Sequence, residues 1–267
     1  MQGQKTLRMP VIAVGALVMT MALVASLGLA GFAPQQAYAS GKKAVYVVTK
    51  KATTYPDGST AITTYKYDKK GLIKSMGEKS VSDSGTYKST VTIAYDKKNS
   101  MQKMVSKTDF GTSTTTYKPN KKGWIVKSTR KGEFGTSTTT YAYTKKGQLQ
   151  KSTDSGATTT YKYDKRGNLI KLTEKSTTNT FIMKFGYDRK NNLARESAKD
   201  VIDNTYKNSY NGKRLTKQVV TDVATKDKRT ITYTYKKVSA PKSLVKMING
   251  QQVYIKCSNV DLVTAHK

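Results

Sequence analysis

The feature that most constrains the fold is a repeat of about 24 residues that covers most of the chain. Its clearest copy is YKYDKRGNLIKL at 161–172, and related copies lie at 65–74, 141–151 and 185–193. A fixed period of this length indicates one small structural unit that packs against its neighbours along the chain. Aligned on their second aromatic position, the copies have anchors at Tyr67, Tyr95, Pro119, Tyr143, Tyr163, Tyr187, Tyr210 and Tyr235.

Each copy contains two turn signals. The residue four positions after an anchor is usually glycine or asparagine, at Gly71, Asn99, Gly123, Gly147, Gly167 and Asn191. These two residue types tolerate a positive φ best, so this position predicts a left-handed turn residue. The second turn lies between anchors and carries an acidic residue, at Asp57, Asp83, Asp109, Glu133, Asp154, Asp203 and Asp227.

The segments between turns predict strands, because they are short and rich in Thr, Tyr, Val and Ile. Residues beyond 40 show no long helical periodicity. We therefore expect an all-β protein, an antiparallel meander of repeated β-hairpins with roughly 16 strands, forming a twisted or curled repeat sheet.

Alternation along the strands assigns the two faces. Tyr161 and Tyr163 share one face of their strand, and Lys162 lies on the other. The tyrosine face is expected either to form the core or to stack on sugar rings, with members Tyr65, Tyr67, Tyr141, Tyr143, Tyr161 and Tyr163. The return strands are expected to add apolar residues near this face, at Leu72, Trp124, Leu149, Leu169 and Leu193.

Composition alone would favour disorder. The chain carries 48 Lys and Arg against 17 Asp and Glu, a formal charge of +31. Leu, Ile, Val and Phe form only about 17% of residues 40–267, and highly charged chains below ~20% are typically disordered. The chain has 18 tyrosines, however, and burying one removes ~150–250 Å² from water. Any core must therefore be built largely from tyrosine.

The first residues resemble an export signal. Lys5 and Arg8 precede an apolar run at 11–29, and Ala37-Tyr38-Ala39 matches a small-residue cleavage site. We expect a signal-peptide helix cleaved after Ala39, which would make the mature protein secreted, extracellular or cell-wall-associated. An uncleaved membrane anchor is the alternative, because the apolar run could span a bilayer.

The repeat divides the remaining chain. The expected organisation is a signal peptide at 1–39, an N-terminal capping hairpin at 40–64, hairpin repeats at 65–238 and a C-terminal cap at 239–267.

The pattern Tyr-x-Tyr-Asp-x-x-Gly-Asn-Leu resembles the YD repeat, also called the Rhs repeat. Residues 161–169 match it almost throughout, and 65–72 and 185–193 match in part. The resemblance implies β-hairpins that coil into a shell, which in long toxins encloses a C-terminal toxin domain. It also implies cell-surface roles and carbohydrate binding. This sequence departs from the pattern at Pro119, which replaces a tyrosine, and at Thr144, which replaces an aspartate.

Basic pairs recur in the turns after the anchors. Successive pairs should lie ~10 Å apart, close to the ~8 Å Debye length at physiological salt, so their fields should merge into one positive edge. Such an edge suits a polyanion or glycan of the cell wall or surroundings, without base-specific nucleic-acid recognition. The simpler alternative is solvated turns that maintain solubility. The residues are Lys69, Lys70, Lys97, Lys98, Lys121, Lys122, Lys145, Lys146, Lys165, Arg166, Arg189 and Lys190.

No catalytic or metal-binding pattern is visible, so we expect no enzyme activity, cofactor or metal. Cys257 is the only cysteine and is expected to be a buried apolar residue, and His266 is the only histidine. The acids are spread along one expected edge rather than paired in a cleft, which disfavours a glycosidase. A secreted hydrolase and an accessory fragment of an Rhs-type toxin system remain the alternatives. Membrane contact is expected only through an uncleaved signal or lipid headgroups. An outer-membrane barrel is disfavoured because neither face is aliphatic.

Overall fold

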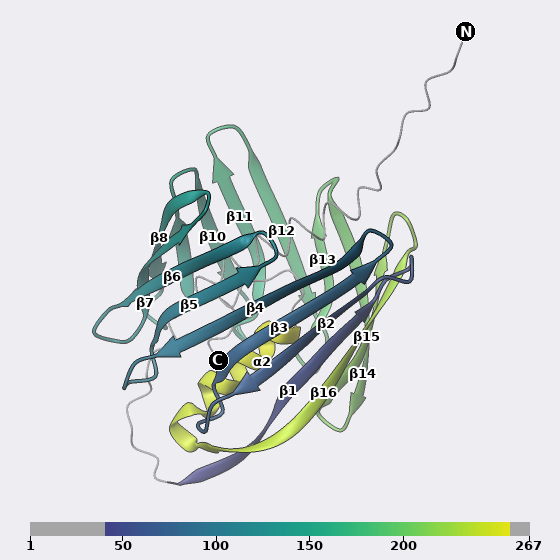
Figure 1. The fold of residues 1–267 in the computed structure, drawn as a ribbon. Helices are drawn as coiled ribbons and strands as arrows, with labels where there is room; N and C mark the ends of the chain where they lie inside the picture. Colours follow the sequence, from purple (N-terminus) through teal and green to yellow (C-terminus); the bar gives the residue numbers. More distant parts are fainter. Residues whose placement is uncertain (1–40, 257–267) are drawn as a thin grey trace.

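The computed structural model describes residues 41–256, which form one closed antiparallel barrel of sixteen strands (Figure 1). The expected signal peptide, Cys257 and His266 lie outside the described residues. The strands are β1 (Lys42–Thr54), β2 (Thr60–Tyr67), β3 (Ile73–Ser82), β4 (Gly85–Tyr95), β5 (Met101–Thr108), β6 (Gly111–Pro119), β7 (Ile125–Gly132), β8 (Gly135–Tyr143), β9 (Leu149–Thr153), β10 (Ala157–Tyr163), β11 (Leu169–Ser176), β12 (Thr180–Tyr187), β13 (Leu193–Ala198), β14 (Ile202–Asn211), β15 (Arg214–Asp222) and β16 (Lys228–Pro241).

The expected hairpin meander is confirmed, but the sheet closes into a barrel, which the expectation of a twisted or curled repeat sheet did not include. Each strand pairs with the next one in sequence, and β1 also pairs with β16 along nearly its whole length. The two terminal strands are the longest, at 13 and 14 residues, and their pairing removes both free sheet edges. The segment 40–64, expected as a capping hairpin, thus supplies the strand that closes the barrel.

The tyrosine face lines the inside of the barrel. Tyr65, Tyr117 and Tyr161 are at most 9% exposed, whereas Lys66, Lys118 and Lys162, next in sequence, are exposed on the outside. Tyr67, Tyr141, Tyr143 and Tyr163 are partly buried and pack against the same core. All six tyrosines singled out in the sequence therefore contribute to the core, as the packing alternative requires, rather than forming an open platform for sugar rings.

One fully buried residue per repeat forms a ring just inside the barrel. It lies opposite the anchor across each hairpin, after a β-bulge at the anchor. The ring consists of Ile73, Met101, Ile125, Leu149, Leu169, Leu193 and Leu215, each at most 2% exposed. Leu149, Leu169 and Leu193 were expected near this face. Leu72 is also buried but precedes the ring residue, and Trp124 is half-buried against the Tyr143 ring, 5.3 Å between centroids.

The turns after the anchors have the predicted backbone. Gly71, Gly147 and Gly167 have φ of 80–85°, and Asn99 and Asn191 have φ of 65° and 67°. In the six turns from β2–β3 to β12–β13, the side chain after the anchor caps the turn by accepting backbone N–H groups. Asp68 Oδ1, for example, accepts from Lys70 N at 2.8 Å and from Leu72 N at 2.9 Å. Thr144, which departs from the repeat pattern, does the same through its Oγ1 to Gln148 N at 3.2 Å.

Anchor tyrosines join each repeat to the one before it. Tyr143 Oη donates to the carbonyl of the ring residue Ile125 at 2.7 Å, and Tyr187 Oη donates to that of Leu169 at 2.9 Å. Tyr95 and Tyr235 make the same bond to the ring residues of their preceding hairpins. Tyr163 differs, because its buried hydroxyl has no hydrogen-bond partner among the described residues.

This difference gives a paired prediction. Tyr143→Phe should lower the free energy of unfolding by about 1 kcal/mol, because it removes the hydrogen bond from Tyr143 Oη to the Ile125 carbonyl. Tyr163→Phe should leave it unchanged or raise it by about 1 kcal/mol, because it removes a hydroxyl that is desolvated without compensation. Urea denaturation followed by circular dichroism measures both variants. Equal losses in the two variants would contradict the assignment.

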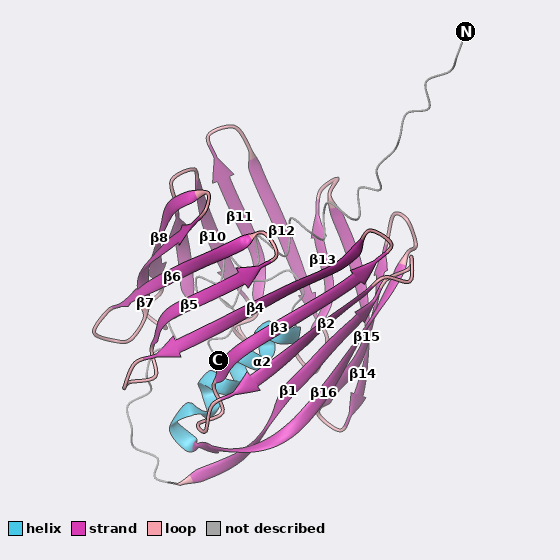
Figure 2. Ribbon diagram, in the orientation of Figure 1, coloured by secondary structure: helices cyan, strands magenta, loops and turns pink. Residues whose placement is uncertain are grey.

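A C-terminal helix lies inside the barrel. The sequence did not predict this helix, because residues beyond 40 show no long helical periodicity. Residues Lys242–Leu244 form the short helix η1, and α2 (Val245–Lys256) follows on the inner side of β1–β3 (Figure 2). Gln252 Oε1 accepts from Val48 N at 2.7 Å and Gln251 Oε1 accepts from Ile73 N at 3.1 Å. Both glutamines are at most 4% exposed, so the expected C-terminal cap at 239–267 includes a helix that is hydrogen-bonded to the barrel wall.

Candidate functional site: the basic rim

The closed meander gathers the basic pairs at one end of the barrel. Every turn that leads from an even-numbered strand to the next strand lies at this end, and six of these turns carry one pair each. All twelve side chains are exposed. We call this set the basic rim: Lys69, Lys70, Lys97, Lys98, Lys121, Lys122, Lys145, Lys146, Lys165, Arg166, Arg189 and Lys190.

Other residues form these turns, and some of the basic side chains make local contacts with neighbouring turns. The aspartate and the left-handed glycine or asparagine define each turn, as described above. Lys70 Nζ donates to Asn99 of the next turn at 2.7 Å, and Lys190 Nζ lies 4.0 Å from the Tyr210 ring centroid. Over residues 41–256, none of the twelve forms an ion pair.

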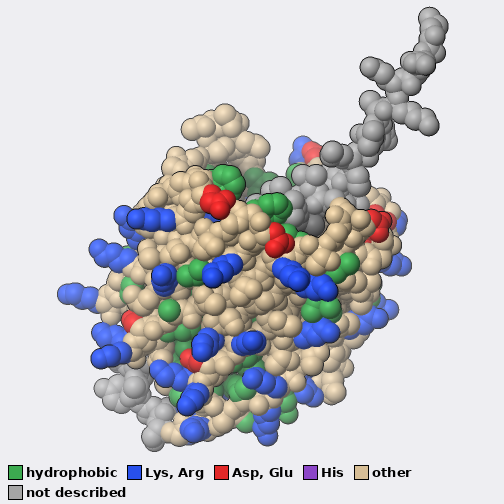
Figure 3. All heavy atoms as spheres, in the orientation of Figure 1, with side chains coloured by type: hydrophobic (Ala, Val, Ile, Leu, Met, Phe, Trp, Pro, Cys, Tyr) green, Lys and Arg blue, Asp and Glu red, His purple; other side chains and the backbone are tan. Residues whose placement is uncertain are grey.

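A second set of bases extends the charge onto the outer wall. It occupies the position eight residues after most anchors, at Lys103, Lys127, Lys151, Lys171 and Arg195. Like charges also face each other directly across strands, as in Lys118 opposite Lys127 and Lys162 opposite Lys171. Figure 3 shows Lys and Arg side chains spread over the face of the outer wall that is in view, so the positive surface is broader than the single edge that the sequence suggested.

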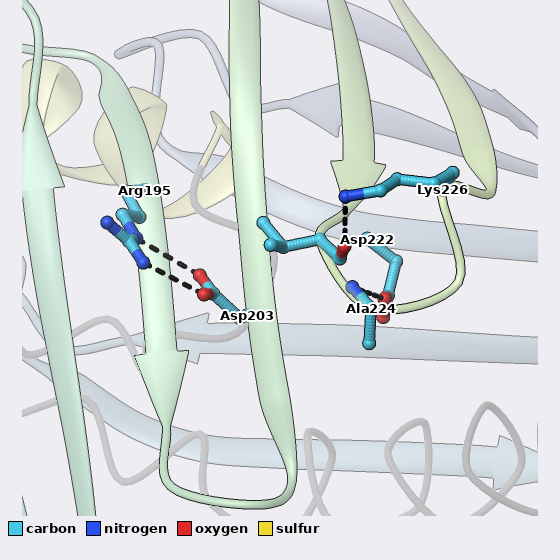
Figure 4. Close-up of polar contacts among 6 residues, drawn as sticks. Arg195, Asp203, Asp222, Ala224 and Lys226 are labelled. Atoms are coloured by element: carbon cyan, nitrogen blue, oxygen red, sulfur yellow. Dashed lines mark hydrogen bonds and ion pairs between the residues drawn. The ribbon is translucent and has the colours of Figure 1, made fainter.

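The opposite end of the barrel carries turn acids, as expected for Asp57, Asp83, Asp109, Glu133 and Asp154. Asp203 is a correction, because it lies within β14 rather than in a turn. Its carboxylate accepts two hydrogen bonds from Arg195 on the outer wall, at 3.0 and 2.8 Å (Figure 4). Asp222 differs from Asp203 because its Oδ1 accepts a backbone hydrogen bond, from Ala224 N at 2.8 Å in the β15–β16 turn (Figure 4).

Sequence reasoning missed a polar network inside the barrel. Glu196 is fully buried and accepts from Tyr206 Oη at 2.5 Å and Asn204 Nδ2 at 2.9 Å, with Arg229 at 3.9 Å. Nearby, Tyr233 donates to Gln218 at 2.5 Å. The signal was available, because Glu196 is an acid at a strand position that alternation turns inward. Buried hydrogen bonds of this kind fix packing, and the described residues of this network do not pair two carboxylates in a cleft.

Burial and hydrogen bonding set the ionisation of the inner phenols. Burial raises the pKa of Tyr95 and Tyr67 well above the ordinary value, and the hydrogen bonds to Gln251 and Gln252 oppose this only in part. Burial also raises the pKa of Tyr210 to about 12, assisted by its hydrogen bond to Asp188. These side chains are therefore neutral hydrogen-bonding groups at neutral pH.

Two features are absent from the described part of the chain. Within residues 41–256, no group of three or more His, Cys, Asp or Glu side chains is arranged to hold a metal ion. No helix in this described range is long and apolar enough to cross a membrane.

Two solved structures are similar to this chain to different degrees. A porin-like protein from Bacteroides uniformis superimposes with a TM-score of 0.54 at 17% identity, covering 71% of this chain and 98% of that one. This likeness supports the fold alone. The Tc holotoxin pore of Photorhabdus luminescens gives a TM-score of 0.32 at 13% identity, covering 64% of this chain and 11% of that one.

The search of curated proteins finds no significant match. The family model of the Teneurin YD-shell matches residues 48–212, which is more than half of the sequence. This match coincides with the tyrosine-anchored hairpins from β1 to β14, and the chain belongs to the Teneurin YD-shell family.

Proposed function

We propose that this protein is an exported, non-catalytic YD-shell barrel that binds extracellular polyanions through its basic rim. The observation that carries the proposal is the convergence of six exposed basic pairs at one end of a rigid barrel. A single lysine pair in a turn has little consequence. Six pairs on neighbouring hairpins, with further bases on the wall below, produce a continuous positive potential that attracts a long polymer better than a small ion.

The arrangement of the turns supports this function over simple solubility. Solvated lysines would serve equally well at either end of the barrel. Instead, the turns at the opposite end carry Asp57, Asp83, Asp109, Glu133 and Asp154, so the turns at the two ends of the barrel carry opposite charges. Such polarity would orient the barrel, with its basic rim toward an anionic wall polymer or glycan.

Charge reversal at the rim tests the proposal. Changing Lys145, Lys146, Lys165 and Arg166 to Glu should weaken binding to long-chain polyphosphate by about tenfold or more. Wild-type binding should also fall steeply as salt rises from low to moderate concentration, because screening removes most of the attraction between exposed charges. Fluorescence anisotropy of labelled polyphosphate measures both effects.

A matched control distinguishes the loss of the basic rim from the loss of net positive charge. The same reversal at Lys79, Lys88, Lys107 and Lys131, which are exposed toward the opposite end, changes the net charge equally. It should weaken binding by less than about threefold. Equal losses in the two variants, with both folded by circular dichroism, would reject the rim as the binding site.

A further inference from the structure

A pocket of about 150 Å³ lies at the acidic end of the barrel, away from the basic rim. It is bounded by the hairpins β5–β6 and β7–β8, and we call it the mouth pocket. Strand pairing places Ser106 opposite Ser113, and Arg130 opposite Ser137. Alternation with the buried Tyr117 places these side chains on the inner face of the wall, so the pocket opens into the mouth of the barrel.

The floor of the pocket contains an unsatisfied hydroxyl. Ser106 lines the pocket and is 2% exposed, and its Oγ has no hydrogen-bond partner among the described residues. A buried polar atom without a partner costs about 1–3 kcal/mol and is uncommon in native structures. Its position in the wall of a pocket indicates that a bound molecule supplies the missing partner.

Opposite charges line the same pocket. Arg130 is half-buried and forms no ion pair with any residue from 41 to 256. Glu133 lies at the edge of the mouth pocket, where its carboxylate packs against Gly111 of the neighbouring turn. A Cβ at Gly111 would lie within 2.2 Å of Glu133 Oε1, so the carboxylate sits directly against this glycine. The pocket therefore offers a guanidinium and a carboxylate that are not paired with each other.

Two exposed phenyl rings complete the pocket. Phe134 is 93% exposed and Phe110 is 50% exposed, and both occupy turn tips that line it. Phe110 stacks on Tyr87 at 5.7 Å between ring centroids, which holds it in place. Large apolar side chains this exposed often mark a binding surface.

We propose that the mouth pocket binds a free amino acid with an apolar side chain. Arg130 would bind the ligand carboxylate through its two-pronged guanidinium, and Glu133 would accept the ligand ammonium. Phe110 and Phe134 would cover the apolar side chain. The volume suits about ten non-hydrogen atoms, counting each as one water-sized group.

Other ligand classes fit less well. A simple organic anion would satisfy Arg130 but would be repelled by Glu133. A neutral sugar would use the serine hydroxyls but would leave the half-buried Arg130 without a counter-charge. Only a ligand that carries both charges satisfies both side chains.

Titration of the full-length protein with L-leucine and L-phenylalanine, followed by NMR or calorimetry, tests this proposal. Saturable binding is expected at concentrations below about 10 mM. Two modified probes remove one charge each: N-acetyl-L-leucine lacks the ammonium, and L-leucinamide lacks the carboxylate. Each should bind about tenfold more weakly than L-leucine. No saturable binding of either amino acid, or equal binding of N-acetyl-L-leucine, would overturn the proposal.

Variants assign the binding to the pocket. Arg130→Gln and Phe134→Ala should each weaken L-leucine binding by about tenfold, and neither residue belongs to the ring or to α2. Arg166→Gln, at the opposite end, is the matched control and should bind like wild type. Unchanged binding in Arg130→Gln would also overturn the proposal. The rim charge-reversal variant should bind L-leucine normally, so this inference and the polyanion function can fail independently.

Discussion

Replacing Gln251 and Gln252 together by alanine is expected to lower the free energy of unfolding by about 4 kcal/mol. Each glutamine oxygen accepts a buried backbone N–H of the wall, from Ile73 and Val48 respectively. Each side-chain amide also donates to an anchor tyrosine hydroxyl, Tyr95 at 3.0 Å and Tyr67 at 3.3 Å. Truncation therefore leaves two buried donors unsatisfied, at about 1–3 kcal/mol each, and removes the packing of both side chains.

The matched control lies on the same helix. Asn249 is exposed between the buried Ile248 and Gly250, so Asn249→Ala changes an amide side chain without touching the wall. Urea denaturation should show a change below about 0.5 kcal/mol for this control. A double variant as stable as the control would mean that α2 does not hold the barrel in the way its hydrogen bonds indicate.

Local patterns in the sequence were sufficient to predict the hairpins. The residue four positions after each anchor needed a positive φ, and Asn99 and Asn191 adopt it just as the glycines do. Alternation assigned Tyr161 inward and Lys162 outward correctly. These predictions succeed because turn conformation and strand alternation are decided within a few residues.

Closure of the barrel was not predictable in the same way. It depends on the pairing of β1 with β16, whose residues are separated by almost the whole described chain. Nothing local in 42–54 distinguishes a capping hairpin from a closing strand. The helix α2 was missed for a related reason, because its inward face includes Gln251 and Gln252, which look like surface residues until their partners Ile73 and Val48 are known.

The two candidate sites differ in the same way, because one depends on local sequence pattern and the other on strand pairing. The basic rim was predicted because its pairs recur at one phase of the repeat, and an antiparallel meander must bring that phase to one end. The mouth pocket was not predicted. Ser106 on β5 and Arg130 on β7 are separated by strand β6, and only the strand pairing shows that both face the same inner surface.

A disulfide across the β1–β16 seam is expected to raise the free energy of unfolding by about 5 kcal/mol. Ala44 and Ser239 are directly paired, and both are exposed on the outer face. Directly opposed antiparallel residues have Cα atoms ~4.5–5.5 Å apart, within the range that a disulfide spans. The large gain follows from the closed loop, because cross-linking residues so far apart in sequence greatly restricts the unfolded chain.

The variant pairs Ala44→Cys with Ser239→Cys, in a background where Cys257→Ser removes the native thiol. Ala44→Cys alone is the control and should leave the free energy of unfolding within about 0.5 kcal/mol of the background protein.

Mass spectrometry of this double-cysteine protein after mild oxidation tests the closed barrel most directly. Closure predicts a monomer in which the tryptic peptides 44–50 and 238–242 are joined by one disulfide in nearly every molecule. An open sheet would keep β1 and β16 apart at its two edges. Free thiols, or disulfides formed only between molecules, would therefore contradict the barrel.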